Sequence, residues 1–221
     1  EDRTRTYVPD DLPPLIEEIE NGVRATQPLE SITGIEKQVC VTLPDERPRA
    51  VVEHTLTNRG IWPVELAPWA ITQFAVGGTA VVPLARERRD PLGMQASDVV
   101  VRWPYTRLDA PELTYHDDWI GVTASDRHQR LKIGTTNPRG WLAYQLDGQT
   151  FVKSTLPADD GSGHADLGAT AQCFRDHRFL ELETLGPLTE LRPGASVDHV
   201  EVWALLAGHP PPDDIDGEVA R

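Results

Sequence analysis

Positive charge is scarce in this sequence. Its 221 residues include 21 Lys or Arg against 35 Asp or Glu, which gives a formal net charge of −14, and only three of the cations are lysines. Because binding to phosphates needs a basic face, we expect no nucleic-acid partner. No stretch approaches the roughly 18 consecutive apolar residues of a membrane helix, so we also expect no membrane partner. The sequence therefore predicts a soluble protein, either cytoplasmic or exported.

Cysteine is nearly absent as well. Cys40 and Cys173 are too few and too far apart in the sequence for a disulfide scaffold or a zinc site, so we expect buried free thiols. The sequence also lacks a GxSxG elbow, a phosphate loop, an HExxH motif and a CxxC pair, which disfavours α/β-hydrolases, P-loop nucleotide enzymes and zinc enzymes. The acids from Asp159 to Asp166 lack the terminal Glu of a calcium loop and favour a turn-rich surface loop. We expect no metal and no cofactor.

Glycine and proline are plentiful and fall between short apolar segments, a pattern typical of the strands and turns of an all-β protein. About nine or more strands are expected in an antiparallel sandwich, with one helical candidate at Pro13 to Asn21. We expect a single domain over residues 1–221, with irregular ends at about 1–20 and 207–221. The clearest expected strands are Val39 to Leu43, Ala50 to Asn58, Ala70 to Val76, Val99 to Trp103, Leu131 to Ile133, Gly140 to Tyr144, Phe151 to Lys153, Phe179 to Leu185 and Val197 to Leu206.

Side-chain alternation sorts the residues of the last expected strand onto two faces. One face carries His199, Glu201 and Trp203 between aliphatic residues, and the other is aliphatic. An imidazole, a carboxylate and an indole together suit a sugar, whose CH faces stack on aromatic rings while its hydroxyls need donors and acceptors. A solvated sheet face is the alternative interpretation.

Two carboxylates share a face in the strand from Phe179 to Leu185. Glu181 and Glu183 lie two residues apart, so desolvation of both would raise one pKa, as a general base requires. The alternative is one buried and one solvated carboxylate. His54 lies between apolar residues on its own strand face and is either a structural residue or an acid or base.

Several segments together form a recognisable pattern. They are His54 to Gly60, Pro63 to Ala70, the pair Gly77-Gly78, Pro83, the GW-x-AY element Gly140 to Tyr144, the FVK element Phe151 to Lys153, the run Phe179 to Gly194 and the segment His199 to Trp203. In these segments the sequence resembles the galactose mutarotase-like superfamily, most closely its mainly bacterial members whose activity is uncharacterised. The resemblance spans roughly Thr6 to Leu206.

The resemblance implies a β-supersandwich with a carbohydrate site on the concave face of one sheet. It also implies further N-terminal strands that this sequence lacks. In aldose mutarotases a glutamate takes the proton from the anomeric hydroxyl while a histidine protonates the ring oxygen. The matching context Leu182-Glu183-Thr184 makes Glu183 the candidate base. The His-Ser-Tyr pattern of the superfamily is absent, since the comparable stretch reads Trp69-Ala70-Ile71, so His54 or His199 would have to supply the acid.

The resulting hypothesis is a carbohydrate-binding protein, with aldose 1-epimerase-like catalysis by Glu183, His54 and His199 as its enzymatic form. The alternatives are a non-catalytic sugar-binding protein and a structural β-sandwich. Lys132 and Lys153 would receive an anionic sugar, unless both are ordinary charges at strand ends. The residues expected to bind the sugar are Trp69, Arg102, Trp103, Lys132, Tyr144, Lys153 and Glu201.

Overall fold

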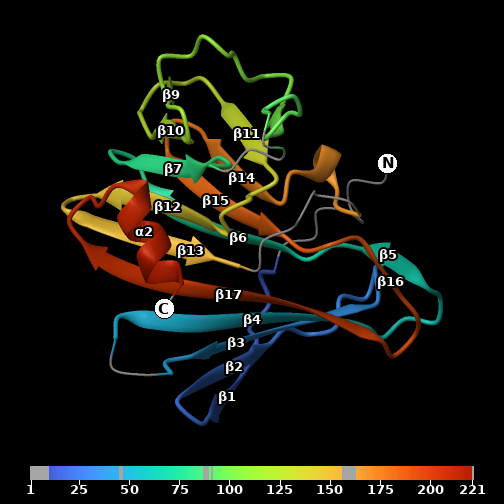
Figure 1. Ribbon diagram of the computed structural model, residues 1–221. Coiled ribbons are helices and arrows are strands. Elements are labelled where there is room, and N and C mark those ends of the chain that lie inside the picture. Colours follow the sequence, from blue (N-terminus) through green and yellow to red (C-terminus); the bar gives the residue numbers. More distant parts are fainter. Residues whose placement is uncertain (1–9, 45–46, 87–89, 91, 156–162, 221) are drawn as a thin grey trace.

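The computed structural model describes residues 10–44, 47–86, 90, 92–155 and 163–220, and these form an antiparallel β-sandwich (Figure 1). The larger sheet has ten strands in the order β1-β2-β3-β4-β17-β13-β12-β7-β10-β9. Their bounds are β1 Leu15–Ile19, β2 Gly22–Thr26, β3 Ile35–Thr42, β4 Arg49–Asn58, β7 Thr79–Pro83, β9 Leu113–Tyr115, β10 Trp119–Thr123, β12 Trp141–Leu146, β13 Gln149–Ser154 and β17 Ser196–Ala207.

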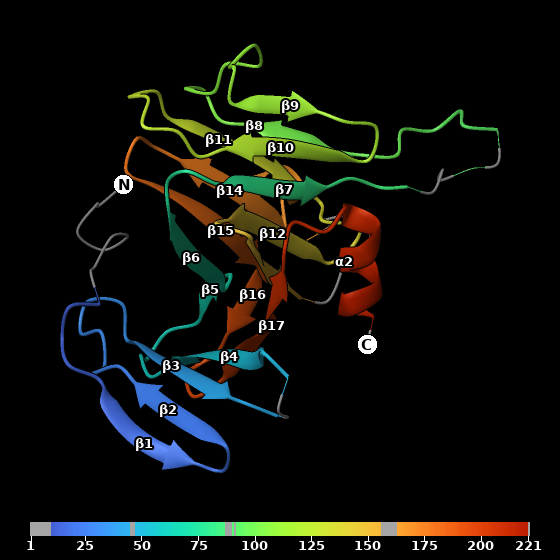
Figure 2. The ribbon, with the colours of Figure 1, turned by 90° about the vertical axis from the view of Figure 1, so that its left-hand side faces the viewer.

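The second sheet has five strands in the order β6-β15-β14-β11-β8 and packs on one part of the larger sheet. Figure 2 shows β1 to β4 extending away from this packed region. A two-stranded ribbon of β5 and β16 completes the strands. The bounds are β5 Val64–Leu66, β6 Trp69–Ala75, β8 Val100–Arg102, β11 Leu131–Thr135, β14 Ala171–Arg175, β15 Phe179–Leu185 and β16 Thr189–Leu191. The all-β antiparallel sandwich expected from the sequence is thereby confirmed.

The main hydrophobic core lies between the two sheets. β7, β10 and β12 contribute apolar side chains from the larger sheet, and β11, β14 and β15 contribute them from the smaller one. β-Branched and leucine side chains alternate with outward-facing residues, which is why these segments form strands. Between β6 and β7 the chain turns at Gly77 (φ 114°) and Gly78, where a Cβ on Gly78 would lie 2.3 Å from the carbonyl oxygen of Gln145.

The C-terminal helix α2 (Pro212–Val219) covers the other face of the larger sheet. Its Ile215 is buried beside Trp141, Ala143 and Val152. The Asp216 carboxylate accepts hydrogen bonds from Trp141 Nε1 at 2.7 Å and from Arg139 Nε at 2.9 Å. The expectation of an irregular end over 207–221 was therefore wrong for residues 212–219. Proline is well suited to the first turn of a helix, and the acids that follow it favour the helix N-terminus.

The predicted helix from Pro13 to Asn21 was also wrong. These residues form β1, which pairs with β2 through a tight turn at Asn21 (φ 55°), so the chain is ordered within the range expected to be irregular. Pairing with β2, which is itself paired with β3, overrides the local helix preference of Glu17 and Glu18. The thiols of Cys40, half-buried, and Cys173, buried in the core, are both free. Burial raises the pKa of the Cys173 thiol.

Residues 159–162 of the acidic stretch from 159 to 166 lie outside the described residues. The single-domain organisation stays a prediction.

Candidate functional site

The outer face of the five-stranded sheet, turned away from the larger sheet, carries the candidate base. In β6, Trp69 and Ile71 are exposed and alternate with the buried Ala70. Glu183 pairs directly with Ile71 across the ladder, so the two side chains share this outer face. Lys132 joins them there through the register of β11, β14 and β15, which aligns Lys132 with Phe174 and Glu181.

Four side chains form what we call the outer cluster: Trp69, Trp103, Lys132 and Glu183. The Oε2 atom of Glu183 accepts a hydrogen bond from Trp69 Nε1 at 2.6 Å and another from Lys132 Nζ at 2.7 Å. The Lys132 ammonium also lies over both indole rings, 5.1 Å from the Trp69 centroid and 4.7 Å from that of Trp103. The aromatic faces and the ion pair thus form one continuous unit.

The second carboxylate oxygen of Glu183 is buried without a partner. Glu183 has an exposed fraction of 0%, and its Oε1 has no hydrogen-bond partner among the described residues. Its cross-strand neighbour Gln172 shows the same feature, because its Oε1 is buried and also lacks a partner in the described part of the chain. A buried polar atom without a hydrogen bond costs about 1–3 kcal/mol. Two such acceptors on paired positions mark a local cost in the polar packing of this face.

Burial dominates the electrostatics of Glu183. Desolvation raises the pKa of its carboxyl, while the Lys132 ammonium and the Trp69 N–H oppose that rise; Glu181 adds a smaller upward contribution. The expected pair of carboxylates on one strand face is present, but burial outweighs their mutual repulsion. Burial also raises the pKa of Tyr105, and the negative charge of Glu183 adds to it.

Local packing fixes the cluster in place. Thr106 Oγ1 donates to the carbonyl of Lys132 at 2.7 Å and accepts from its amide at 2.8 Å, which holds the turn that carries Trp103 beside β11. On β11 the chain needs Gly134, because a Cβ there would lie 2.7 Å from the Cβ of Ala169. That close approach lets the Gln172 amide nitrogen donate to Asp166 at 2.8 Å.

The opposite face of β15 carries a second polar group, the inter-sheet cluster of His54, Lys153, Thr184, His199 and Glu201. Glu201 lies on β17 and is fully buried. Lys153 Nζ lies 2.8 Å from its Oε1, the Thr184 hydroxyl donates to it, and Trp203 Nε1 donates to its Oε2 at 3.0 Å. His54 Nε2 lies 3.4 Å from Oε2. Every polar atom of this carboxylate is bonded.

Partners also surround the buried ammonium of this cluster. Lys153 Nζ donates to the carbonyls of Ala70 at 2.9 Å and Leu182 at 3.3 Å and so ties the two sheets together. Burial lowers the pKa of Lys153, and the Glu201 carboxylate opposes that shift. Burial alone would raise the pKa of Glu201. Hydrogen bonds from His199 and His54 and the charge of Lys153 outweigh burial and hold this pKa well below its ordinary value.

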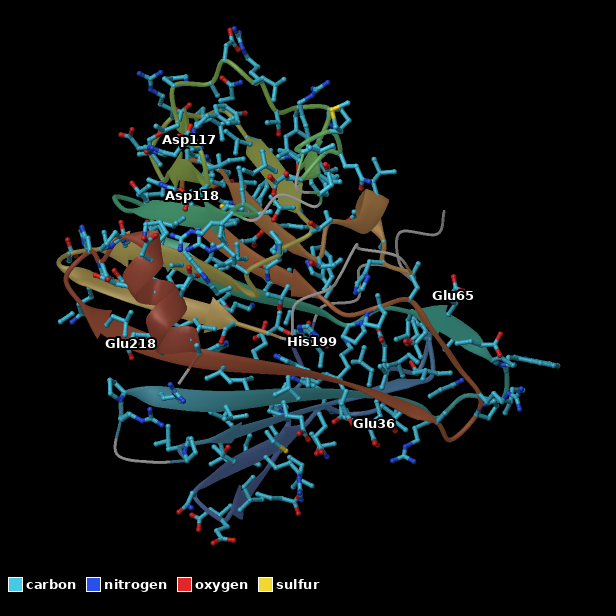
Figure 3. The ribbon with its side chains drawn as sticks, in the orientation of Figure 1. Glu36, Glu65, Asp117, Asp118, His199 and Glu218 are labelled. Atoms are coloured by element: carbon cyan, nitrogen blue, oxygen red, sulfur yellow. The ribbon has the colours of Figure 1, made fainter. Side chains whose placement is uncertain are left out.

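The structure does not bring Glu183 together with either candidate acid. Thr184 points from β15 toward the larger sheet, where its hydroxyl lies 2.9 Å from His199 Nε2. Because side chains alternate along a strand, the preceding residue Glu183 points to the outer face. His199 is buried on β17 (labelled in Figure 3), and His54 pairs with it on β4. The expected convergence of Glu183 with His54 or His199 therefore does not hold, because β15 separates the base from both imidazoles.

The expected sugar-binding face of β17 was also misassigned. His199 and Glu201 face the smaller sheet and are buried, whereas Val200 of the aliphatic face is exposed. Lys153 is buried too and is bound to Glu201, so it cannot receive an anionic sugar. Both predictions failed because alternation separates the faces without showing which face another sheet covers.

Two further predicted binding residues lie apart from the outer cluster. The Tyr144 hydroxyl donates to the carbonyl of Ala75 at 2.6 Å and accepts from the Gly78 amide at 2.9 Å, within the main core. Tyr144 thus supports the turn at Gly77-Gly78. Arg102 pairs with Ile133, so it lies on the face opposite Lys132, and its guanidinium donates to the carbonyl of Thr106 at 3.2 Å. Trp69, Trp103 and Lys132 are the predicted binding residues that the structure brings together with Glu183.

A groove of about 470 Å³ lies between β3 and β4 of the larger sheet and the start of β6, and His54 and Trp69 both line it. Trp69 is 52% exposed and lines this groove, and its Nε1 donates to Glu183, which is not among the lining residues. On the groove wall Lys37 Nζ lies 2.6 Å from Asp10. The residues of the outer face that sequence reasoning missed are Gln172, Tyr105 and Gly134. The only signal for Gln172 was its place in the short strand AQCFR, which lacks a clear alternating pattern.

Among the described residues, no group of three or more His, Cys, Asp or Glu side chains is placed to hold a metal ion. No helix in that part of the chain is long and apolar enough to cross a membrane.

Comparisons with known proteins support the fold. No protein-family profile and no curated protein sequence matches this chain. Solved structures do match. One is a candidate aldose 1-epimerase from Escherichia coli K12, with a TM-score of 0.56 and 14% identity over 87% of this chain and 68% of the other. Another is a galactose mutarotase-like protein from Lactobacillus casei, with a TM-score of 0.55 and 12% identity over 87% of this chain and 73% of the other.

An aldose epimerase homologue from C. elegans matches with a TM-score of 0.52 and 13% identity over 88% of this chain and 69% of its own. At these identities the likeness concerns the fold. The chain thus has the fold of the galactose mutarotase-like superfamily, as its sequence resemblance predicts.

Proposed function

We propose that this chain binds a monosaccharide at the outer cluster. The observation that carries this proposal is the exposed indole of Trp69, whose Nε1 donates to the Glu183 carboxylate beside the Lys132 ammonium. A sugar that stacks on this indole would approach a carboxylate with one oxygen, Oε1, that has no partner among the described residues.

The aromatic rings around Glu183 supply the other half of sugar recognition. Trp69 offers an exposed indole, and Trp103 is half-buried on the other side of Lys132. Indole faces stack against the CH groups of a pyranose, while the ammonium of Lys132 donates to its hydroxyl oxygens. The fold supports the same class of ligand, since the named neighbours are mutarotase-like and aldose epimerase-like proteins.

The charge of the outer cluster favours a neutral sugar. Lys132 is 8% exposed and forms a 2.7 Å ion pair with Glu183, so its positive charge is already compensated. The idea of an anionic ligand depended on Lys132 and Lys153 acting as free cations, and both are bound to carboxylates. We therefore propose a neutral aldose.

Epimerase catalysis is the second candidate, and one observation favours it. Burial raises the pKa of Glu183, which suits a general base that takes a proton from an anomeric hydroxyl. Lys132, already 2.7 Å from this carboxylate, would then be the proton donor in place of the histidines. This arrangement differs from the pairing expected from the superfamily, and a base held by an ammonium is a weaker one. Binding without catalysis is thus the better supported function.

Proton NMR of freshly dissolved aldoses tests both candidates in one tube. The panel is glucose, galactose, mannose and xylose, with glucuronate and glucose 6-phosphate as anionic comparisons. We expect saturation transfer from the protein to at least one neutral aldose and its loss in Glu183→Gln. Accelerated anomer interconversion that disappears in Lys132→Met would establish catalysis as well. A folded protein that transfers saturation to none of these sugars would contradict the proposal.

A further inference from the structure

A second set of aromatic side chains continues the outer face beyond Glu183. Phe174 on β14 pairs with both Lys132 and Glu181, and Phe179 occupies the outward position of β15 two residues before Glu181. Tyr105, 42% exposed, meets Phe174 edge-on with a centroid separation of 6.4 Å. The Phe174 and Phe179 centroids are 6.0 Å apart. Together Tyr105, Phe174 and Phe179 form what we call the aromatic row.

The aromatic row is continuous with the outer cluster. Tyr105 belongs to the same turn as Trp103, and Thr106 fixes this turn to the backbone of Lys132. Phe174 lies directly opposite Lys132. The distance between outward positions of a strand is about 6.6 Å, since each residue advances about 3.3 Å. The row thus begins within one side chain of the outer cluster.

Polar groups accompany the aromatic row as they accompany the outer cluster. Glu181 accepts a hydrogen bond from Gln73 Nε2 at 2.7 Å, and Gln73 is exposed, with an amide oxygen that can accept from solvent or a ligand. The Arg178 guanidinium lies 5.5 Å from the Phe179 ring centroid at the far end. A hydrogen-bonding pair beside ring faces is the combination that a pyranose needs, and here it occurs twice along β15.

We infer that the aromatic row is a second sugar subsite, so that the ligand is a disaccharide or a longer glycan with one ring at the outer cluster and the next at the row. This inference rests on the proposed function, because it extends the same face. A protein partner would require an apolar surface, but the carboxylate and amide groups between these rings would then be buried at a cost. Each ring of a glycan carries both hydroxyls and CH faces, so a glycan can hydrogen-bond the polar groups while it stacks on the aromatic rings.

Isothermal titration calorimetry on the full chain tests the subsite. The probes are glucose and galactose, then maltose, cellobiose and lactose, which contain these rings. We expect at least one disaccharide to bind about tenfold more tightly than its monosaccharide, the effect of one additional stacked ring. Tyr105→Leu and Phe179→Leu should each remove most of this gain and leave the monosaccharide Kd unchanged. Trp62→Leu, an exposed aromatic outside the row, is the matched control and should retain the gain.

The outcomes separate the two proposals. Monosaccharide binding with no tighter binding of any disaccharide would overturn the subsite and leave the proposed function standing. A disaccharide gain that survives both Tyr105→Leu and Phe179→Leu would also overturn it. Failure of every mono- and disaccharide to bind would overturn the subsite together with the proposed function. Retained monosaccharide affinity in the variants excludes misfolding as the cause of a lost gain.

Discussion

Strand β15 carries a polar cluster on each of its faces, and the two differ in how fully their carboxylates are hydrogen-bonded. On the inner face, the Glu201 carboxylate forms an ion pair with Lys153 and accepts hydrogen bonds from Thr184 and Trp203, so both of its oxygens have partners. On the outer face, one oxygen of Glu183 accepts hydrogen bonds from both Lys132 and Trp69, and the other oxygen has no partner among the described residues. Both carboxylates are fully buried, so exposure does not distinguish them.

The difference separates stability from binding. Buried polar groups that hold a structure together are almost always fully hydrogen-bonded, and those that are not call for an explanation such as a ligand. The inter-sheet cluster meets the first description because Lys153 on β13 reaches carbonyls of β6 and β15 across the core. The outer cluster meets the second. Adjacent residues of one strand, Glu183 and Thr184, thus take part in different tasks.

The largest effect should follow removal of the inter-sheet ammonium. Lys153→Met leaves Glu201 ionised and buried without its cation, a defect that costs about 3–5 kcal/mol of unfolding free energy. Urea unfolding at neutral pH measures it. The control is Lys37→Met, which breaks a partly exposed pair with Asp10 and should cost about 1 kcal/mol or less. Equal losses in the two variants would contradict the structural role of the inter-sheet cluster.

Neutralising each carboxylate in turn sharpens the same contrast. Glu201→Gln should lower the unfolding free energy by about 1.5–3 kcal/mol, since hydrogen bonds to a charged group are lost or weakened. Glu183→Gln should cost less than Glu201→Gln, because the amide oxygen still accepts from Trp69 and Lys132 and the raised pKa of Glu183 means that the folded state disfavours its charge. Thermal unfolding of both variants checks the order. A larger loss for Glu183→Gln would reverse our assignment.

The two carboxylates should also respond to acid with opposite sign. The folded-state pKa of Glu201 lies below its ordinary value of 4.5, so its contribution to stability is complete above pH 4.5 and is lost as the pH falls toward the folded pKa. The pKa of Glu183 is raised, so protonation of Glu183 favours the folded state. Below pH 4.5, Glu201→Gln should reduce the slope of unfolding free energy against pH by about 1.4 kcal/mol per unit. An unchanged slope would count against the buried ion pair.

Separating the two functions of Trp69 gives a smaller effect. Trp69→Phe keeps an aromatic face but removes the Nε1 donor to Glu183, which should weaken monosaccharide binding by about fivefold, equivalent to roughly 1 kcal/mol. Trp69→Ala removes both and should weaken it further. Calorimetric titration of the two variants against the same aldose measures the difference. Identical affinities for Trp69→Phe and Trp69→Ala would show that stacking contributes nothing.

The smallest effect should come from His54. Its imidazole lies 3.4 Å from Glu201 on the inner side of β15, so His54→Gln should leave sugar binding at the outer cluster unchanged within about twofold. Saturation-transfer NMR with the bound aldose checks this. Loss of binding in a folded His54→Gln protein would restore the histidine to the site and favour the groove that it lines.

The sequence could predict the strands with clear alternation and the shared face of Glu181 and Glu183. β4, β15 and β17 follow their expected segments closely because each carries many β-branched or alternating residues. It could not predict which face of β17 lies against another sheet, since His199 and Glu201 look polar in either setting. Short strands such as β14 and β9 were missed because their pairing depends on neighbours distant in the sequence.

The candidate base and its aromatic surroundings could be found from residue type, but its geometry could not. Glu183, Lys132, Trp69 and Trp103 come from four separate segments, and only the register of β6, β15, β14 and β11 brings them together. The histidines were wrongly grouped with Glu183 because alternation within one strand does not show on which side of a neighbouring strand a residue lies. The helix at 212–219 was not predicted, because a proline run excludes a central strand but also suits the first turn of a helix.

The most direct test of the account compares saturation transfer from the protein to its bound aldose in the wild type, Glu183→Gln and Glu201→Gln, all at a temperature where each is folded. The account predicts loss of the signal in Glu183→Gln and its retention in Glu201→Gln, although the latter is the less stable protein. Retention in Glu183→Gln with loss in a folded Glu201→Gln would contradict it, because the binding site would then lie on the inner face of β15.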